Sequence, residues 1–596
     1  MRLKEIGSLS PKLARGVWLI EAFAALGISL IFANIGGYID EADNVAVAQL
    51  IVLDGSVLYR DLFSHHFPFA YYWTALFFKL FGISIFNARL AVIILNALAF
   101  GSVGLILRNW RVGTLTWLIW ACVSPFFLGH LMLYQSLAAV ALAPVFAGGF
   151  AYVSRRPLPN LWGMALVGLF AAIAILANPL TLFAVGLTFI GIALPFGTGF
   201  LPRRLHHLTR QRQFESALCT AFILAPFIGV VLGSFGFLGL NGALGDFYRD
   251  VVIFNRDIYA RYSDTVRTGL LANLSKIALN VISGLTLFDP SQRMYPIDAL
   301  KTFSVLAEWL ISDITFKLII IFYCLWLVLK RQSLAALYVF AFAACALMRG
   351  RTNFDQLPLL MCAVVVLAMW QADKVTGGQD DRATRWQGDK VTVPPKSIAL
   401  HPSSFIPHPS PFILHPSSFI LYPSSFLLPP SLWLSPLIAL LVIIGIDFGL
   451  QQRNSLTATQ VLAKDATTAL TLQQWVCGQP DVKLGYYPAN PYVHFYSQLR
   501  PVSRYLFVWP WVAEIGATDI ATTLTQAPYS IVSIVTQGDI WGVPNAVSLA
   551  PIATVVQRDF VKIDNEGDAN SGLYLSRPLY DACVKKIKNE KFKMKN

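Results

Sequence analysis

The sequence predicts an α-helical polytopic membrane protein with a small C-terminal extracytoplasmic α/β domain. Of its 596 residues, 56% are hydrophobic and only 13% are charged, and the mean hydropathy is +0.58. A soluble protein is typically about 25% charged. The apolar residues also form about eleven runs, each near the length that a helix needs to cross the hydrocarbon. These runs lie at roughly 17–34, 88–107, 112–128, 136–153, 161–177, 180–197, 215–236, 311–329, 333–348, 357–372 and 432–449.

The basic residues set the expected topology. The formal charge of +13 would suggest nucleic acid in a soluble domain, but most Lys and Arg flank apolar runs and alternate from loop to loop, so we expect no nucleic-acid partner. We predict a cytoplasmic N-terminus, an uncleaved first span and a location in the cell (inner) membrane. The acidic first loop, residues 246–301 and 349–355, and the C-terminal domain are then extracytoplasmic.

The chain divides into four expected parts. Residues 1–372 form a transmembrane module, with a first external loop at 35–87 that includes a juxtamembrane helix over Phe67–Gly82. The alternative for this stretch is a further full span, which would invert every later loop and break the pattern of basic residues. Residues 373–431 form a cytoplasmic low-complexity linker, 432–450 the last span and 451–596 the C-terminal domain. The linker repeats units such as HPSSFIL, whose prolines exclude a heptad helix. Its regular histidines are interpreted as part of an expanded repeat rather than as metal ligands.

The C-terminal part alternates helical and β-rich stretches. We expect a helix over Ala458–Trp475 and strands over Val482–Tyr487, Tyr529–Val535, Val555–Val561 and Gly572–Leu575. Two of the seven cysteines, Cys477 and Cys583, flank the β-rich core of this part. We predict that they form a disulfide, the alternative being two free thiols.

The stretch after the first apolar run carries the strongest functional signal. Asp40 and Glu41 are followed by further acids, by Arg60, and by His65 and His66. Charge beside hydrocarbon is costly, so acids at this position suggest a function. One carboxylate could act as a general base while the other orients a substrate or cation. The alternative is that the loop is acidic only because it lies on the external face of the membrane, and that its acids have no role in chemistry.

The order of short motifs in this loop resembles a known family. D-E, G-S-V-L-Y-R-D, H-F-P-F-A-Y-Y-W, F-K-L-F-G-I-S and N-A-R-L follow one another within Gly37–Leu90. They resemble the first external loop of membrane glycosyltransferases with a C-type fold, of the protein O-mannosyltransferase-like and aminoarabinose-transferase-like kinds. The resemblance implies transfer of a hexosyl or pentosyl group from a polyprenyl-phosphate carrier to a lipid, glycan or protein acceptor. Asp40 matches the acidic catalytic position and Glu41 its neighbour.

The residues fit a single displacement at an anomeric carbon. One carboxylate would act as base without a covalent intermediate, which inverts the configuration. Cations would hold the departing phosphate. We expect these cations among Arg60, His66, Arg256, Arg261, Arg349 and Arg351. The alternatives are ordinary surface charge for Arg256 and Arg261, and pairing with Asp355 or bulk lipid phosphate for Arg349 and Arg351.

The sequence also departs from the family pattern. Many relatives have Lys-Pro-Pro where this chain has His66-Phe67-Pro68, and a carboxylate at the start of the fourth span, where this chain has Gln135. No cofactor is firmly implied, and dependence on a divalent metal is left open. Two other function classes compete: a transporter or flippase of lipid-linked sugars, and a non-catalytic envelope assembly protein. The sequence has no P-loop, HExxH or GxSxG motif.

Overall fold

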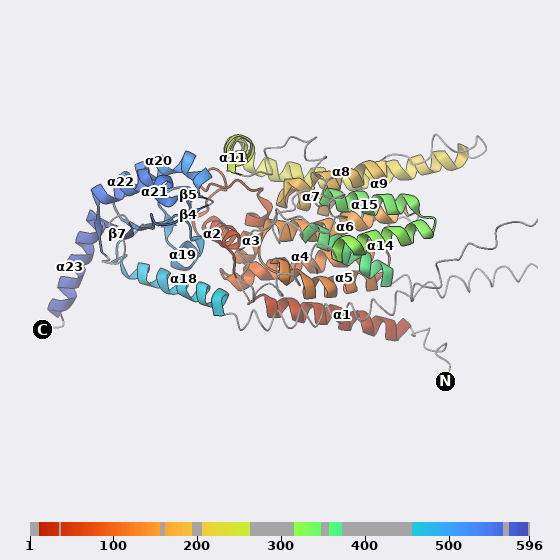
Figure 1. Ribbon diagram of the computed structural model, residues 1–596, viewed down its shortest axis with the longest axis horizontal. Coiled ribbons are helices and arrows are strands. Elements are labelled where there is room, and N and C mark those ends of the chain that lie inside the picture. Colours follow the sequence, from red (N-terminus) through yellow and green to blue (C-terminus); the bar gives the residue numbers. More distant parts are fainter. Residues whose placement is uncertain are drawn as a thin grey trace, which may run out of the picture.

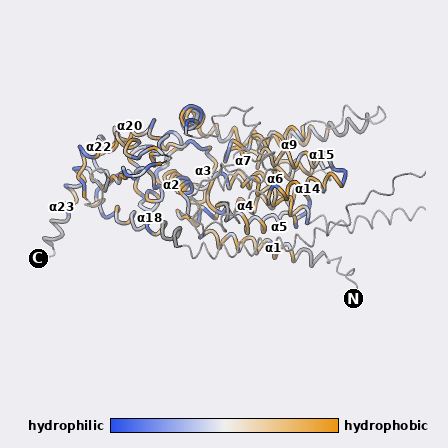
Figure 2. The backbone as a smooth tube through the Cα atoms, viewed as in Figure 1, coloured by the Kyte–Doolittle hydropathy of each residue, from blue (hydrophilic) through white to orange (hydrophobic). Residues whose placement is uncertain are grey.

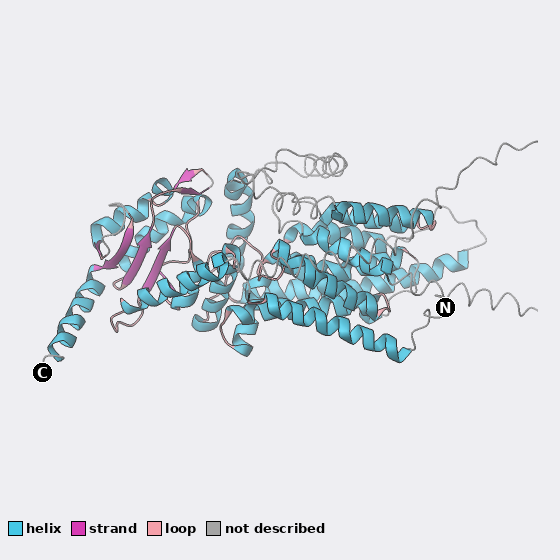
Figure 3. Cartoon of the chain, turned by 60° about the horizontal axis from the view of Figure 1, so that its bottom comes forward, coloured by secondary structure: helices cyan, strands magenta, loops and turns pink. Residues whose placement is uncertain are grey.

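The computed structural model is elongated, with a bundle of helices at one end and a smaller part built around a β-sheet at the other (Figure 1). Among the described residues, the strands lie in the C-terminal part of the chain (Figure 3). The expected linker 373–431, the expected span 432–450, Arg349 and Arg351 lie outside the described residues. The structure describes residues 11–34, 37–154, 161–193, 206–262, 315–346, 357–371, 456–540, 542–563 and 571–593.

The bundle is built from apolar helices, and hydrophobic residues predominate along them (Figure 2). Three described segments are long and apolar enough to cross a bilayer: Ile85–Ile106, Tyr134–Val153 and Ser216–Leu240. Shorter apolar helices accompany them, as expected for an integral membrane protein. The helices are α1 (Pro11–Phe32), α4 (Ile85–Ile106), α5 (Trp110–Val123), α6 (Tyr134–Val153), α7 (Leu161–Ala177), α8 (Leu182–Ala193), α9 (His206–Leu240), α14 (Thr315–Leu329), α15 (Ser333–Ala346) and Leu357–Gln371, with short 3₁₀ turns η1 (Ser124–Phe127) and η2 (Pro179–Thr181).

Small residues allow the bundle helices to approach closely. A Cβ atom added to Gly168 on α7 would collide with the backbone carbonyl of Ile223 on α9, and one added to Gly148 on α6 would collide with Val167 on α7. Apolar side chains gain little from leaving lipid, so membrane helices depend on such close backbone contact. The glycines therefore fix the packing of three neighbouring helices.

Two helices follow α1 in the first loop. Helix α2 (Ile39–Asp54) begins with acidic residues in its first turn and ends at Gly55, which adopts a left-handed conformation with φ 66°. Acids are favoured at the positive end of a helix and glycine at its end. Helix α3 (Phe69–Phe81) follows Pro68 and confirms that the apolar stretch Phe67–Gly82 is a short helix.

A second connecting segment follows α9. It consists of α10 (Leu244–Phe247), two π-helical segments, η4 (Tyr248–Ile253) and η5 (Asn255–Tyr259), and a last turn, α11 (Ala260–Tyr262). Consecutive π-helical turns are rare in proteins and frequently occur at functional sites. This segment contains Arg256 and Arg261 and is helical, whereas the sequence predicts an external loop here.

The C-terminal part is organised around a five-stranded sheet in the order β2-β1-β3-β7-β6. Strand β1 (Lys483–Tyr487) runs parallel to β2 (Arg500–Pro501) and β3 (Ser530–Ile534), with Lys483 opposite Arg500 and Ser530. Strand β7 (Gly572–Ser576) is antiparallel to β3 and to β6 (Phe560–Lys562). The remaining elements are α18 (Leu456–Gln474), α19 (Pro491–Ser497), α20 (Pro510–Gln526), the β4–β5 pair (Asp539–Ile540, Val543–Pro544), α21 (Asn545–Ser548), α22 (Ala550–Asp559) and α23 (Arg577–Lys593).

One strand prediction in this part is wrong. The stretch Val555–Val561, expected as a strand, is mostly the end of helix α22, and only Phe560 and Val561 belong to β6. The β-branched residues suggested a strand. However, Ile552, Val555 and Val556 are spaced three and four apart and bury one helical face.

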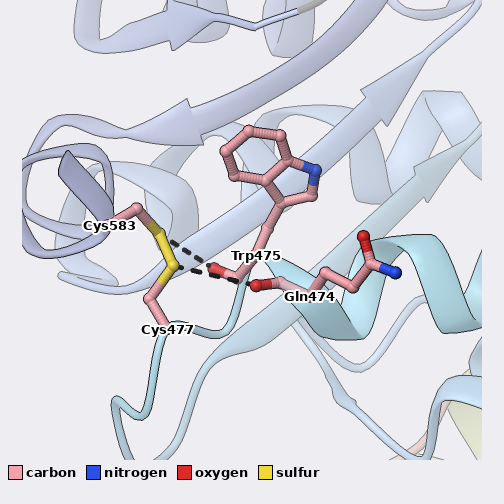
Figure 4. Close-up of a disulfide and its surroundings, with 4 residues drawn as sticks. All are labelled: Gln474, Trp475, Cys477 and Cys583. Carbon is pink, nitrogen blue, oxygen red and sulfur yellow. Dashed lines mark hydrogen bonds between the residues drawn. A yellow bond between two sulfur atoms is a disulfide. The ribbon is translucent and has the colours of Figure 1, made fainter. Parts of the chain in front are cut away.

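The predicted disulfide is confirmed. Cys477 and Cys583 are joined, with their Cα atoms 5.2 Å apart. In Figure 4 the bridge lies beside the backbone carbonyls of Gln474 and Trp475, at the end of α18. It connects that end to the C-terminal helix α23, on which Cys583 lies. The other described cysteines are free thiols.

Candidate active site

The acidic pair predicted from the sequence lies in the first turn of α2. We had expected both carboxylates on a loop. Successive helical residues are about 100° apart around the axis, so Asp40 and Glu41 face different surroundings, whereas Asp40 and Asp43 share one side. Asp40 and Asp43 are half-buried and Glu41 is fully buried. The helix thus separates the two carboxylates expected to act in catalysis.

The carboxylate of Glu41 is held entirely by protein groups. Arg89 on α4 donates from Nε to Oε1 (2.9 Å) and from Nη2 to Oε2 (2.6 Å). The backbone N–H of Met132 donates to Oε1 (3.0 Å), and the hydroxyl of Tyr492 donates to Oε2 (2.9 Å). Burial alone would raise the pKa of Glu41, but the ion pair and these hydrogen bonds outweigh it and lower the pKa. Glu41 therefore remains ionised and anchors α2.

Arg89 also fixes the position of α2 relative to the first span. Its Nη1 donates to the carbonyl of Ala33 (3.1 Å), just beyond the end of α1. A cation is favoured at the negative end of a helix. One buried guanidinium thus joins α1, α2 and α4. Arg89 is the arginine of the N-A-R-L motif, to which the sequence assigned no role of its own. A charge inside an apolar span is itself a signal of function or buried pairing.

Asp43 is a third carboxyl in this part of α2, beyond the pair predicted from the sequence. Its Oδ2 accepts a hydrogen bond from Tyr71 on α3 (3.0 Å). The Tyr71 hydroxyl also lies 2.7 Å from that of Ser64, which accepts from the backbone N–H of His66 (3.1 Å). Oδ1 is shielded from solvent and has no hydrogen-bond partner among the described residues. Burial, with a smaller contribution from the charge of Asp40, raises the pKa of Asp43 to about 7.

Aromatic rings continue from this network toward the C-terminal part. The His66 ring lies 4.2 Å from the Tyr134 ring and 3.9 Å from the His65 ring. The next rings in the row are Tyr259 on η5, 5.2 Å from His65, and Trp511 on α20, 5.5 Å from Tyr259. The row brings together the first loop, the start of α6, the π-helical segment and the C-terminal part.

Ion pairs reinforce the same junction. The buried carboxylate of Asp250 on η4 pairs with Arg504 of the C-terminal part and with Arg249. Glu514 on α20 accepts from Arg261 and from the hydroxyl of Tyr262. The side-chain amide of Asn255 donates to the carbonyl of His65 (2.9 Å). The π-helical segment is therefore fixed between the first loop and the C-terminal part.

The predicted phosphate-binding cations have partners of their own. Arg60 pairs with Asp61 (2.8 Å), and Arg256 pairs with Asp257 (2.6 Å). Arg261 pairs with Glu514, as described above. The arginine of each of these three pairs is exposed, and such pairs are weak enough to exchange partners with a phosphate. The structure brings Arg60 and His66 into the same loop, whereas Arg256 and Arg261 lie on the π-helical segment and the turn that follows it.

Within the part of the chain that the structure describes, no group of three or more His, Cys, Asp or Glu side chains is arranged to hold a metal ion. The expectation on metal dependence therefore stays open. Gln135, at the position where the family that the first loop resembles often has a carboxylate, is buried at the start of α6. Its Oε1 has no hydrogen-bond partner among the described residues.

Comparison with known proteins found similarity among solved structures. No family model matches the sequence, and no curated protein does. The chain is similar to ArnT from Cupriavidus metallidurans in the apo state, with 14% identity, a TM-score of 0.48, and coverage of 94% of this chain and 98% of that one. ArnT from the same organism bound to undecaprenyl phosphate is 14% identical, with a TM-score of 0.47 and coverage of 95% of this chain and 98% of that one. The oligosaccharyltransferase AglB from Archaeoglobus fulgidus, in complex with an inhibitory peptide and a dolichol phosphate, is 14% identical. Its TM-score is 0.43, with coverage of 96% of this chain and 78% of that one. ArnT is an aminoarabinose transferase.

Proposed function

We propose that the protein is a membrane glycosyltransferase that uses a polyprenyl-phosphate sugar, with Asp40 as its general base. The observation that carries this proposal is the different environment of the two carboxylates in the first turn of α2. Glu41 is buried and neutralised by Arg89, whereas Asp40 is half-buried on the side of the helix that also bears Asp43. A general base must be able to reach the proton that it removes. The partial exposure of Asp40 supports it in this role, and the full burial of Glu41 disfavours Glu41.

The position of α2 suits a lipid-linked donor. The helix begins a few residues after α1 ends at Phe32, so Asp40 is close to one end of an apolar span. A polyprenyl-phosphate sugar carries its reactive anomeric carbon at the depth of the lipid headgroups. An acceptor that approaches from the aqueous side would then meet donor and base together. By the distribution of basic residues, we assign this side to the extracytoplasmic face.

The proposed reaction is a single displacement. Asp40 takes the proton of an acceptor hydroxyl while its oxygen attacks the anomeric carbon from the face opposite the phosphate. The bond between that carbon and the phosphate oxygen breaks, and polyprenyl phosphate leaves with the electron pair. The product has inverted configuration, since no covalent intermediate with the enzyme forms. Cations that hold the departing phosphate replace an added acid; within the described residues, our candidates are Arg60, His66, Arg256 and Arg261.

The remaining expectations extend this proposal. We assign the cell (inner) membrane as the location, a cytoplasmic N-terminus and an extracytoplasmic C-terminal part. Arg349 and Arg351 stay candidates for the carrier phosphate, as do Arg256 and Arg261. The acceptor is a lipid, a glycan or a protein.

The test is donor consumption by the purified protein in lipid nanodiscs. A panel of polyprenyl-phosphate hexoses and pentoses with labelled sugars would be incubated with candidate acceptors, and release of polyprenyl phosphate would be followed. Consumption of one donor, with label transferred to an acceptor, supports the proposal. If reconstituted liposomes instead move the intact sugar lipid between leaflets without cleavage, the protein is a flippase and the proposal fails.

A further inference from the structure

The residues on both sides of Asp40 contact one side chain from the far end of the sequence. Tyr492 lies on α19, and its ring is buried. Its hydroxyl donates to Oε2 of Glu41 (2.9 Å) and lies 3.3 Å from the backbone nitrogen of Tyr38, which donates to it. One oxygen atom thus bonds to a group two residues before Asp40 and to another one residue after it.

These two bonds matter because of where they lie on α2. Tyr38 is the N-cap residue of the helix, and it makes no side-chain cap of its own. Unpaired N–H groups at a helix start must find acceptors elsewhere. The bond to Glu41 involves an ionised carboxylate, so it is stronger than a bond between neutral groups. The hydroxyl of Tyr492 therefore fixes both the start of the helix and the residue after Asp40.

The absence of a side chain at Gly37 leaves room for the Tyr492 hydroxyl to approach α2 this closely. A Cβ atom on Gly37 would lie 3.2 Å from the Tyr492 hydroxyl oxygen and 3.3 Å from Cδ2 of Leu462 on α18. Both distances are tighter than ordinary contacts, so glycine gives the space that the approach requires. Further along α2, the side-chain amide of Gln49 donates to the carbonyl of Phe495 on α19 (3.0 Å). Helix α19 therefore contacts α2 at its start and near its middle.

We propose that Tyr492 is a positioning residue for Asp40, through which the C-terminal part holds the general base in its reactive geometry. This inference rests on the proposed function, in which Asp40 is the base. The physical reason is that a base displaced by a fraction of an ångström loses alignment with the acceptor proton. Tyr492 does not touch the substrate in this account. Its effect passes through the backbone at Tyr38 and the carboxylate of Glu41.

The test compares Tyr492→Phe with Tyr496→Phe. Phenylalanine keeps the ring of Tyr492 and removes only the hydroxyl. Tyr496 lies one turn further along α19, with its ring stacked 6.3 Å from that of Tyr492, and its hydroxyl makes no hydrogen bond to the residues that the structure describes. We expect Tyr492→Phe to lower kcat about tenfold, as loss of a bond to a charged group implies, with the KM for the donor unchanged. Tyr496→Phe should match the wild type.

Hydrogen exchange gives a readout that does not depend on activity. In Tyr492→Phe, amides at the start of α2 should exchange faster, while those of α3 should not change. If the wild type transfers no sugar, the proposed function fails, and faster exchange would then show only that Tyr492 orders α2. If kcat is unchanged in Tyr492→Phe, or falls equally in Tyr496→Phe, Tyr492 does not position the base, even where the Tm drops.

A second variant covers failure of Tyr492→Phe to fold. Gly37→Ala places a Cβ atom 3.2 Å from the Tyr492 hydroxyl oxygen, so that the hydroxyl must shift. Gly55→Ala at the end of α2 is not a matched control, because Gly55 has a positive φ at which an added side chain is strained. The better control is Gly101→Ala on α4, where an added Cβ meets nothing within 4 Å. Gly37→Ala should reproduce the fall in kcat at constant KM, and Gly101→Ala should not. Equal kinetics in the two alanine variants would overturn the proposal.

Discussion

Arg89 and Glu41 form a buried ion pair in which two guanidinium nitrogens meet two carboxylate oxygens, at 2.9 and 2.6 Å. The two side chains are 1% and 0% exposed. A charge in such surroundings is stable only while its partner is present. The pair therefore makes the position of α2 depend on α4, 48 residues away in the sequence.

Removal of one partner should destabilise the protein strongly. Arg89→Ala leaves the Glu41 carboxylate buried and unpaired, which typically costs about 3–5 kcal/mol of unfolding free energy. Thermal unfolding in detergent, followed by the intrinsic fluorescence of tryptophan, would measure the loss. Arg60→Ala is the matched control, because the Arg60–Asp61 pair is exposed and should contribute little. Equal Tm values for the two variants would show that the Arg89 pair does not hold the bundle.

The carboxyl of Asp43 should make stability depend on pH. Its pKa is about 7 in the folded protein, against an ordinary value of 3.8. Between these values the folded state keeps a proton that the unfolded state releases, so unfolding free energy falls as the pH rises from about 4 to about 7. Asp43→Asn cannot ionise. We expect its Tm advantage over the wild type to grow between pH 5 and pH 7.5. A constant difference across that range would exclude titration of Asp43.

The stability of the contact between η4 and the C-terminal part should depend on the carboxylate of Asp250. Its carboxylate is 2% exposed and pairs with Arg504, whose side chain is 17% exposed. Asp250→Asn leaves that arginine without its counter-ion, so we expect a lower Tm and faster proteolysis within 244–262. Asp257→Asn changes an exposed pair on the next π-helical segment and should leave both measurements unchanged. Indistinguishable cleavage in the two variants would contradict this role of Asp250.

The disulfide should contribute to the stability of the C-terminal part. It joins residues 106 apart in sequence, and the chain-entropy model assigns a loop of that length about 4–5 kcal/mol. Cys477→Ser should therefore lower the Tm of that part. A reductant should bring the wild type to the value of the variant and leave the variant where it is. A wild-type Tm that resists the reductant and equals that of Cys477→Ser would rule out this contribution.

The sequence predicted the features that depend on local pattern. Apolar runs near 88–107, 136–153 and 161–177 are helices α4, α6 and α7. The pairing of Cys477 with Cys583 followed from the positions of the two cysteines around the β-rich core. The helix predictions depend on residues that are close together in the sequence. The disulfide prediction depends only on the positions of two cysteines on either side of the β-rich core.

The partners of the site residues could not be predicted in the same way. Tyr492 contacts Glu41 across 451 residues, and no local pattern distinguishes it from Tyr496 on the same helix. The pKa of Asp43 depends on burial beneath Tyr71, which only the packed loop creates. Glu41 and Asp40 appear equivalent as a D-E pair. Their difference arises because the chain there is helical: the Glu41 side chain is buried against Arg89, whereas Asp40, about 100° further round the helix, is half-buried.

The most direct test of the account is the turnover of Asp40→Asn. Asparagine keeps the size of the side chain and its hydrogen bonding but removes its basicity, so transfer from the polyprenyl-phosphate donor should fall about a hundredfold or more. Asp54→Asn, at the other end of α2, changes an acid that pairs with Arg500 and should retain its activity. Both variants should fold and bind polyprenyl phosphate as the wild type does. A folded Asp40→Asn protein with near-normal turnover would contradict the assignment of Asp40 as the base.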